Sequence, residues 1–305
     1  MRILITGGAG FIGSHIVDEC VRRGYDICVI DNLFTGKRDN IAEHIAHGKI
    51  TFHAVDICDP SAVEKVFQEF HPEVVFHLAA QINVRAGIEK PSFDAHVNIL
   101  GSLNILEAMR KFQCPRIIFS STGGALFSGG NPPYSEADIP SPDTPYGISK
   151  LTVERFLDFY GHQYGIISTI LRYSNVYGPR QNAQGEAGVI SLFIDKIRQE
   201  HTPLIFGDGT QTRDFVSVHD VVAANLHVLD HSLLGIYHVG TGKETSVNQL
   251  WETLVGLTKT TLIPEYGPPL GEIQHTSLDS KRLISTGWVI STPFLQGVSA
   301  LIDGI

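Results

Sequence analysis

The sequence has few cysteines and no pair of them spaced to bind a metal. Its 305 residues include four cysteines, Cys20, Cys28, Cys58 and Cys114, and no two of them have the C-x-x-C spacing of a zinc or redox site. All four lie in the first half of the chain. We therefore expect reduced, mostly buried thiols, as in a cytoplasmic protein.

Long apolar runs and an excess of basic residues are also missing. No stretch approaches the length of a membrane span, and Met1 and Arg2 lead straight into a short apolar run with no sign of a signal peptide. Acidic residues outnumber basic ones by 32 to 23, which gives a net charge of −9. This balance disfavours non-specific binding to nucleic acid or to anionic membranes. We expect a cytoplasmic protein with neither partner.

The sequence gives little support for a metal centre. His227 and His231 are four residues apart on a predicted helix, a spacing that metal ligands can have. No third ligand is evident, so the two histidines are predicted to lie on a packed or solvated helix face, and no metal is expected.

The first thirty residues, in contrast, have the pattern of a dinucleotide site. Residues 2–6 form a short apolar run typical of a strand buried in a parallel sheet, and a helical pattern extends to about residue 23. Gly7 between them allows a tight turn, Gly10 lets the backbone approach a pyrophosphate, and Gly13 lets the helix pack against the strand. The phosphates would sit at the helix amino terminus, where free N–H groups favour negative charge.

An acidic residue, Asp31, ends the next predicted strand, residues 26–30. At that position a carboxylate accepts hydrogen bonds from the adenosine ribose and repels a 2′-phosphate, which favours NAD over NADP. A glycine pattern alone is weak evidence, but in this order of strand, turn, helix, strand and acid it predicts dinucleotide binding strongly.

Tyr146 and Lys150 are the best candidates for chemistry. Pro142, Thr144 and Pro145 indicate a helix start, so the two side chains lie one turn apart on one helix face. An ammonium group near a phenol favours the phenolate, so we expect Lys150 to lower the pKa of Tyr146 from about 10 toward the range of a general base. Taken alone, the pair could equally be a tyrosine and a lysine on a solvated helix.

The G-x-x-G-x-x-G spacing, together with the distant Tyr146-x-x-x-Lys150, resembles the short-chain dehydrogenase/reductase superfamily, in particular its extended members that act on nucleotide sugars. The resemblance covers nearly the whole chain and implies NAD as the cofactor. It implies cofactor contacts from the glycine turn, the strand ends and the catalytic helix: Gly7, Gly10, Phe11, Ile12, Gly13, Asp31, Asn32, Gly36, Asp56, Ile57, Leu78, Ala79, Ala80, Gln81, Asn98, Ser120, Tyr146, Lys150 and Tyr173.

Two polar residues in this part of the chain, Asn98 and His77, are interpreted as supporting residues. Asn98 lies inside a predicted helix over residues 92–112, where it is a poor helix former, and the resemblance implies that it supports the adjoining strand and loop. His77 ends the predicted strand of residues 74–77, and we interpret it as a buried histidine rather than a catalytic one.

The resemblance also implies the catalytic roles. Tyr146 is the general base, and Lys150 binds the nicotinamide ribose. Thr122, just beyond the predicted strand of residues 116–119, hydrogen-bonds the reacting sugar hydroxyl, with Ser121 as the alternative. Dehydratases and decarboxylases of this family carry an acidic residue directly after that hydroxyl, and here the position is Gly123. The absence of the carboxylate favours simple epimerisation.

The second half resembles the substrate site of these proteins. Residues 172–180 resemble the signature Arg-Tyr-x-Asn-Val-Tyr-Gly-Pro, and a glycine-rich turn with an arginine follows at residues 206–216. Arg213 is favoured as a phosphate ligand because a guanidinium group can donate two hydrogen bonds to a phosphate. The residues implied in substrate binding are Thr122, Tyr146, Asn175, Val189, Phe206, Arg213, Glu272 and Thr276.

One part of this pattern is incomplete. Pro269-Leu270 stands where the family has Arg-Pro, so a second phosphate-binding arginine is missing, and Lys281, Arg282 or Arg180 could replace it. The small Thr276 occupies the position that, by resemblance, gates the pocket beside the sugar C2. We therefore expect room for N-acetylated sugars.

Together these features predict a Rossmann-type, doubly wound parallel α/β sheet with a smaller, interleaved substrate-binding domain. Residues 1–170 are predicted to form the NAD-binding domain, to which a segment near residues 210–235 returns. Residues 171–305 are predicted to form mainly the nucleotide-sugar-binding domain. The resemblance further implies a homodimer built through helices over residues 92–112 and 146–164.

The expected activity is NAD-dependent 4-epimerisation of a UDP-hexose through a 4-keto sugar. UDP-glucose and UDP-galactose are the first candidates, with UDP-GlcNAc and UDP-GalNAc as further ones. A UDP-glucuronate 4-epimerase and a nucleotide-sugar reductase are the alternatives. A non-catalytic protein that binds NAD or a nucleotide sugar is less favoured, because Thr122, Tyr146 and Lys150 are all present.

Overall fold

The computed structural model describes residues 1–182, 188–269 and 273–303. Its central element is a parallel sheet of seven strands in the order β11-β6-β5-β4-β1-β2-β3. The bounds of these strands are β1 Arg2–Thr6, β2 Asp26–Ile30, β3 Thr51–His53, β4 Val74–His77, β5 Arg116–Thr122, β6 Ile167–Tyr173 and β11 Gly235–Val239. The order reverses between β1 and β4, as expected for a doubly wound sheet, and the resulting crevice lies at the carboxyl ends of these strands.

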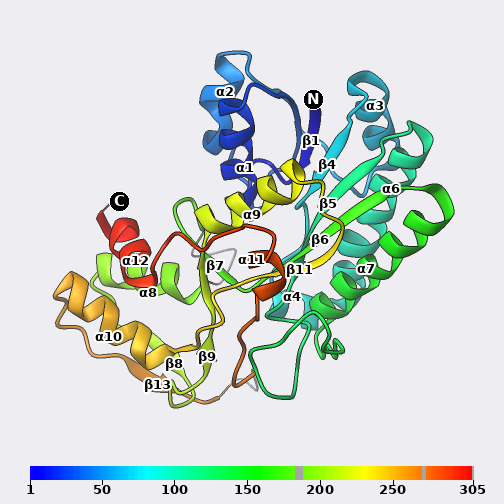
Figure 1. The fold of residues 1–305 in the computed structure, drawn as a ribbon. Coiled ribbons are helices and arrows are strands. Elements are labelled where there is room, and N and C mark those ends of the chain that lie inside the picture. The colour runs from blue at the N-terminus through cyan, green and yellow to red at the C-terminus, as the bar shows by residue number, and fades with distance from the viewer. Residues whose placement is uncertain (183–187, 270–272, 304–305) are drawn as a thin grey trace.

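Helices cover both faces of this sheet because its strands are apolar on both sides (Figure 1). Ile3 and Ile5 face one core, formed with α1 (Phe11–Arg22) and α9 (Val218–Asp230). Leu4 faces the other, formed with α3 (Pro60–Phe70), α6 (Gly101–Lys111) and α7 (Pro145–Tyr164). Shorter helical segments among the first hundred residues are η1 Arg38–Ile41, α2 Ala42–Ala46, α4 Val84–Glu89, α5 Pro91–Ala95 and η2 His96–Leu100.

The long helix predicted over residues 92–112 is divided. Between α5 and α6 the chain makes one wider π-helical turn, η2, with Asn98 buried in its middle. The side chain of Asn98 bonds both main-chain polar groups of Gln81, accepting from its N–H and donating to its carbonyl, at 2.8 and 2.9 Å. A π-turn of this kind often accompanies a functional site.

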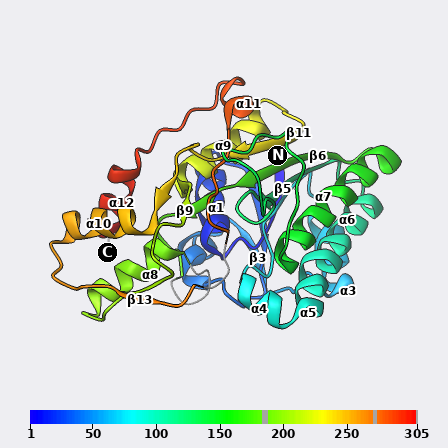
Figure 2. The same ribbon diagram turned by 90° about the horizontal axis from the view of Figure 1, so that it is seen from below.

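A smaller lobe built mostly from the second half of the chain packs beside the sheet (Figure 2). Its core is formed by α8, α10 and α12 with the adjoining strands, and includes Phe193, Trp251 and Leu254. The bounds are β7 Asn175–Tyr177, α8 Val189–Arg198, β8 Leu204–Phe206, β9 Thr212–Arg213, β10 Phe215–Ser217, β12 Thr245–Ser246, α10 Val247–Thr258, β13 Glu265–Gly267 and α12 Phe294–Asp303. Helix α11, Lys281–Ile284, packs instead on β11 of the main sheet, with Leu283 in the core formed with α1 and α9. In this lobe β10 pairs with β7, β12 with β9, and β13 with β8.

The chain passes more than once between the two regions. Strand β6 crosses residue 170 within the main sheet, and β11 pairs with β6 in parallel after the chain has visited the smaller lobe. Ser217 caps α9 by accepting a hydrogen bond from the His219 N–H, and α9 packs on α1. The boundary at residue 170 stays a prediction.

Candidate active site

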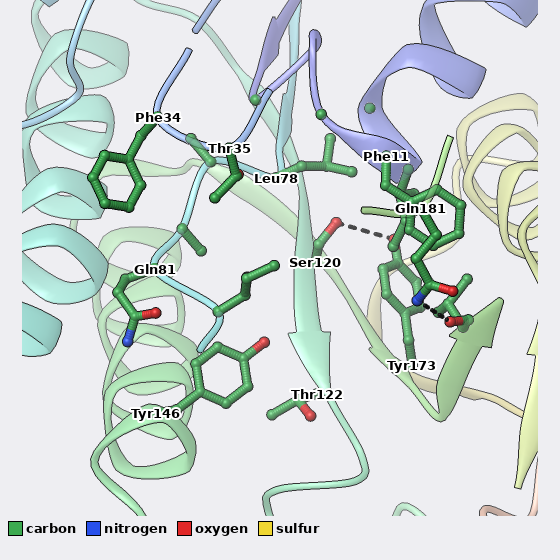
Figure 3. Close-up of a pocket in the computed structure, with 18 of the residues that line it drawn as sticks. Phe11, Phe34, Thr35, Leu78, Gln81, Ser120, Thr122, Tyr146, Tyr173 and Gln181 are labelled. Atoms are coloured by element: carbon green, nitrogen blue, oxygen red, sulfur yellow. Dashed lines mark hydrogen bonds between the residues drawn. The ribbon is translucent and has the colours of Figure 1, made fainter. Parts of the chain in front are cut away.

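A cavity of about 440 Å³ opens at the carboxyl ends of the central strands, between the sheet and the smaller lobe (Figure 3). The predicted cofactor residues that line it are Gly7, Gly10, Phe11, Ile12, Gly13, Asp31, Asn32, Asp56, Ile57, Leu78, Ala79, Ala80, Gln81, Ser120, Tyr146, Lys150 and Tyr173. Thr122, Asn175 and Val189, three of the predicted substrate residues, line it as well. One pocket therefore collects residues from strand ends across most of the sheet.

The glycine turn leaves no room for side chains. Gly7 has a φ of +70°, and a Cβ atom there would lie 2.8 Å from the Ala79 nitrogen. A Cβ atom on Gly13 would lie 2.1 Å from the Gly7 carbonyl oxygen. Phe11, Ile12 and Gly13 form the first turn of α1, where main-chain N–H groups have no acceptor within the helix. The turn is thus shaped to hold an anion at the helix start.

Asp31 is held rigidly at the end of β2. One carboxylate oxygen accepts from the Ala9 N–H at 3.0 Å and the other from the Leu33 N–H at 2.8 Å. Burial raises the pKa of Asp31, and these two hydrogen bonds oppose the rise. Gly36 does not line the cavity, but a Cβ atom there would lie 2.9 Å from the Asp31 carboxylate, so the glycine makes space for the acid.

Asn98 likewise lies behind the cavity wall. It shapes the pocket through Gln81, whose main chain it holds on both sides. His77 is fully buried between Thr6 and Ser102, with ring nitrogens 2.7 and 2.9 Å from their hydroxyls. The interpretation of His77 as a structural residue agrees with this position.

Tyr146 and Thr122 lie next to each other on the cavity wall, and Figure 3 shows the Tyr146 hydroxyl pointing into the cavity. Tyr146 is in the first turn of α7, whose cap is Thr144, and Thr122 is the last residue of β5. Thr122 Oγ1 accepts from the Ala125 N–H at 3.3 Å, which leaves its O–H available to a ligand. The pair contributes two hydroxyl groups to the same wall of the pocket.

The expectation that Lys150 lowers the pKa of Tyr146 is wrong for the protein chain alone. Burial, and next the charge of Asp94, raise the pKa of Tyr146 above its usual value. The Lys150 ammonium lies 5.9 Å from the Tyr146 ring centre and donates to the Ser120 carbonyl at 2.8 Å. Burial lowers the pKa of Lys150 itself to about 8, against the opposing charges of Asp94 and Glu154. Desolvation outweighs the attraction between ammonium and phenolate that the helical spacing suggests.

Ser121, the alternative to Thr122, is engaged elsewhere. Its hydroxyl donates to Glu154 at 2.5 Å, and Glu154 also accepts two hydrogen bonds from Arg172, all three side chains being buried. Ser120 bonds the Tyr173 hydroxyl at 3.0 Å. Of the three consecutive hydroxyl residues, Thr122 is therefore the one with a hydroxyl free to meet a substrate.

Three predicted substrate residues, Phe206, Arg213 and Thr276, are not among the residues that line this cavity. Phe206 lines a separate cavity of about 670 Å³ together with Tyr266 and Gln274. The Arg213 guanidinium donates to the carbonyls of Thr212 and Ile273, both at 2.8 Å. Thr276 is buried. Glu272, with Leu270 and Gly271, lies outside the described residues, so roles for these four substrate-site positions stay predictions.

None of the candidates for the missing arginine lines the cavity. Lys281 pairs with Asp279 at 2.8 Å, Arg180 pairs with Asp18 at 2.8 Å, and the Arg282 guanidinium lies 4.8 Å from the Tyr237 ring centre.

Sequence reasoning also missed residues of the site. Phe34, Phe93 and Gln181 line the cavity, and the rings of Phe34 and Phe93 are 6.4 Å apart. Asp94 was missed as well, although it is fully buried beneath Tyr146 and Lys150. In the sequence, Asp94 is one acidic residue near the start of a predicted helix, and that position does not show which groups its carboxylate contacts.

Comparison with known proteins places this arrangement in a family. Residues 3–240 match the model of the NAD dependent epimerase/dehydratase family. The chain belongs to this family. It is 46% identical to a putative UDP-glucose 4-epimerase of Methanocaldococcus jannaschii, with 99% of this chain and 97% of the relative aligned.

Two solved structures are similar over almost their whole length. The UDP-glucose 4-epimerase of Thermotoga maritima with UDP-glucose is 41% identical, with a TM-score of 0.94, covering 99% of this chain and 98% of that one. The UDP-glucose 4-epimerase of Thermus thermophilus in complex with NAD is 39% identical, with a TM-score of 0.93 and the same coverage. The prediction of an epimerase-like, Rossmann-type member of the extended short-chain dehydrogenases is confirmed.

Among the residues that the structure describes, no helix is both long and apolar enough to span a membrane. Within the same residues, no group of three or more potential metal ligands occurs. His227 bonds Thr286, and His231 bonds the carbonyl of His227.

Proposed function

We propose that this family member is an NAD-dependent 4-epimerase of a UDP-hexose, with UDP-glucose and UDP-galactose as its first pair of substrates. The observation that carries the proposal is the position of Tyr146, Thr122 and Lys150 on the wall of the cavity that also contains the glycine turn. The three similar proteins described above are a putative UDP-glucose 4-epimerase and two UDP-glucose 4-epimerases, one of them in complex with NAD.

The lining residues fit NAD. The first turn of α1 offers N–H groups to the pyrophosphate, in a turn too tight for any side chain at Gly7 or Gly13. We assign Asp31 to the adenosine ribose and Lys150 to the nicotinamide ribose. NAD bound there would supply the hydride acceptor for oxidation at the sugar C4 and, as NADH, the hydride donor for reduction of the 4-keto sugar.

The chain's own residues manage the proton. Tyr146 as phenolate takes the proton of the sugar 4-hydroxyl. It gives the proton back to the same oxygen after the 4-keto sugar has rotated to present its other face. Thr122 hydrogen-bonds that oxygen throughout. Because burial raises the pKa of Tyr146, the phenolate needs the positive charge that Lys150 and oxidised NAD bring to the pocket.

The position after Thr122 argues against elimination. A Cβ atom on Gly123 would lie 2.3 Å from Leu278, which is fully buried. The space that an acidic side chain would need in a dehydratase or decarboxylase is filled by an apolar one. This packing favours epimerisation within a family that contains both activities.

The test uses purified protein with UDP-glucose and UDP-N-acetylglucosamine in separate reactions, without and with added NAD, and chromatography that separates the 4-epimers. We expect the galacto-epimer, and loss of at least about 100-fold in kcat for Tyr146→Phe, since the general base is removed. The variant should still bind NAD. No turnover of either sugar would contradict the proposal. UDP-glucuronate as the only substrate, or net oxidation of NADH by a keto-sugar, would select one of the two alternative activities.

We also propose a homodimer in the cytoplasm. Apolar side chains remain exposed on α4, α5, η2 and α7, namely Ile88, Phe93, Leu100, Ile148, Phe159 and Tyr164. These helices pack against one another, and exposed apolar side chains gathered on neighbouring helices commonly mark a protein interface. Light scattering at micromolar concentration should give twice the chain mass, and Leu100→Glu should shift the protein toward monomer. A monomeric wild type would contradict this assembly.

The four free cysteines are consistent with a reducing compartment.

A further inference from the structure

Asp94 is a fully buried carboxylate that the proposed chemistry does not use. It lies in α5, between the catalytic helix α7 and the loop that follows β4. One oxygen accepts from the Ser149 hydroxyl at 2.6 Å, and the other from the Gln81 amide at 2.9 Å. Ser149 directly precedes Lys150, and Gln81 lines the cavity. A single side chain therefore joins two walls of the active site.

The surrounding chain is adapted to a carboxylate at this point. A Cβ atom on Gly87 would lie 3.0 Å from the Asp94 carboxylate, so the glycine lets α4 pass close by. Both donors are neutral groups, and a buried charge with only neutral partners is costly. An asparagine has one oxygen and one N–H₂ group, so it could not present an oxygen to both donors as Asp94 does. The retained charge thus has an electrostatic partner elsewhere.

That partner is Lys150, the cation of the catalytic pair. Around Asp94, the titratable groups of α4, η2 and the intervening link, Arg85, Glu89, Lys90 and His96, are exposed to solvent. From α7, Tyr146 and Lys150 face it inside the protein, with Glu154 one turn beyond Lys150. The Asp94 charge raises the pKa of Lys150, against the effect of burial, and adds to the rise of the pKa of Tyr146.

We propose that Asp94 is a positioning residue of the active site, which fastens the catalytic helix, through Ser149, to the Gln81 loop that lines the cavity. The inference rests on the proposed function, because it assigns Asp94 a part in the same reaction. The hydrogen bonds define the geometry, and the charge sets the pH range over which Tyr146 and Lys150 hold their active protonation states.

The experiment compares Asp94→Asn, Ser149→Ala and Glu89→Gln with wild type, all loaded with NAD. Removing the Asp94 charge lowers both pKa values, so both limbs of the pH profile of kcat/KM should move to lower pH, by about one unit. Ser149→Ala keeps the carboxylate, so it should lower kcat while both limbs stay in place. Glu89→Gln removes an exposed acid of α4 and should match wild type.

A second readout does not depend on turnover. The tyrosinate absorbance of Tyr146, taken as the difference between each protein and its Tyr146→Phe counterpart, should titrate at lower pH in Asp94→Asn than in wild type. Unchanged pH limbs and an unchanged titration midpoint in Asp94→Asn would overturn the proposal. If that variant does not fold, an unchanged kcat in Ser149→Ala overturns it alone. Absence of turnover in wild type counts against the proposed function, while the titration still decides the role of Asp94.

Discussion

Among single residues, Thr276 has the most direct predicted influence on the choice of sugar. It is buried in a segment held by main-chain hydrogen bonds on both sides, from Thr212 N–H to the Gln274 carbonyl and from Tyr134 N–H to the Ser277 carbonyl. A larger side chain at this position cannot turn outward to solvent, so it must take space from the interior.

We predict that Thr276→Tyr loses the N-acetylated substrate selectively. Turnover of UDP-N-acetylglucosamine should fall at least about tenfold, because the family resemblance puts this position beside the sugar C2, where a few added atoms change discrimination by this order. Turnover of UDP-glucose should change little. The measurement is kcat/KM for both sugars.

Thr276→Val, of nearly equal size, is the matched control and should keep both activities. The melting temperature of each variant shows whether the larger ring is accommodated. Equal losses for the two sugars in Thr276→Tyr would contradict a role in sugar choice.

For whole elements, apolar patterns and caps predicted most of the sheet and its helices. The strand before the glycine turn, the helix after it, and α7 with its Thr144 cap agree with the structure because local signals and tertiary packing coincide there. The division of the predicted helix over residues 92–112 could not be read from the sequence. It depends on Asn98 bonding the main chain of Gln81, a partner 17 positions away.

The same difference, between local sequence signals and contacts with residues distant in sequence, explains which site residues could be predicted. Glycines and hydroxyls at strand ends follow from topology, since the carboxyl ends of parallel strands meet at one edge of the sheet. The pKa of Tyr146 could not be predicted from its spacing to Lys150, because it depends on desolvation and on Asp94, which another helix contributes. The difference between Ser121 and Thr122 likewise depends on Glu154, which is distant in sequence.

At the scale of the molecule, the two cores are joined through a sheet that contains buried polar groups. His77 is fully buried, and burial lowers its pKa to about 3, from an ordinary value near 6.5. His238 is also fully buried, and burial, followed by the charge of Arg172, lowers its pKa to about 4. Both side chains are neutral in the folded protein at pH values where the unfolded chain already binds a proton.

We therefore predict that the free energy of unfolding falls as the pH drops from about 6.5 toward 4, by up to about 1.4 kcal/mol per pH unit for each buried histidine. Above pH 6.5 both states hold neutral imidazoles, so this contribution is complete there. His77→Gln removes one of the two groups and should flatten the slope, although its absolute stability will be lower because the bonds to Thr6 and Ser102 change. His47→Gln, at an exposed position, should keep the wild-type slope. Urea denaturation at pH 7, 6, 5 and 4 measures all three proteins, and equal slopes for His77→Gln and His47→Gln would show that His77 is not a source of the acid sensitivity.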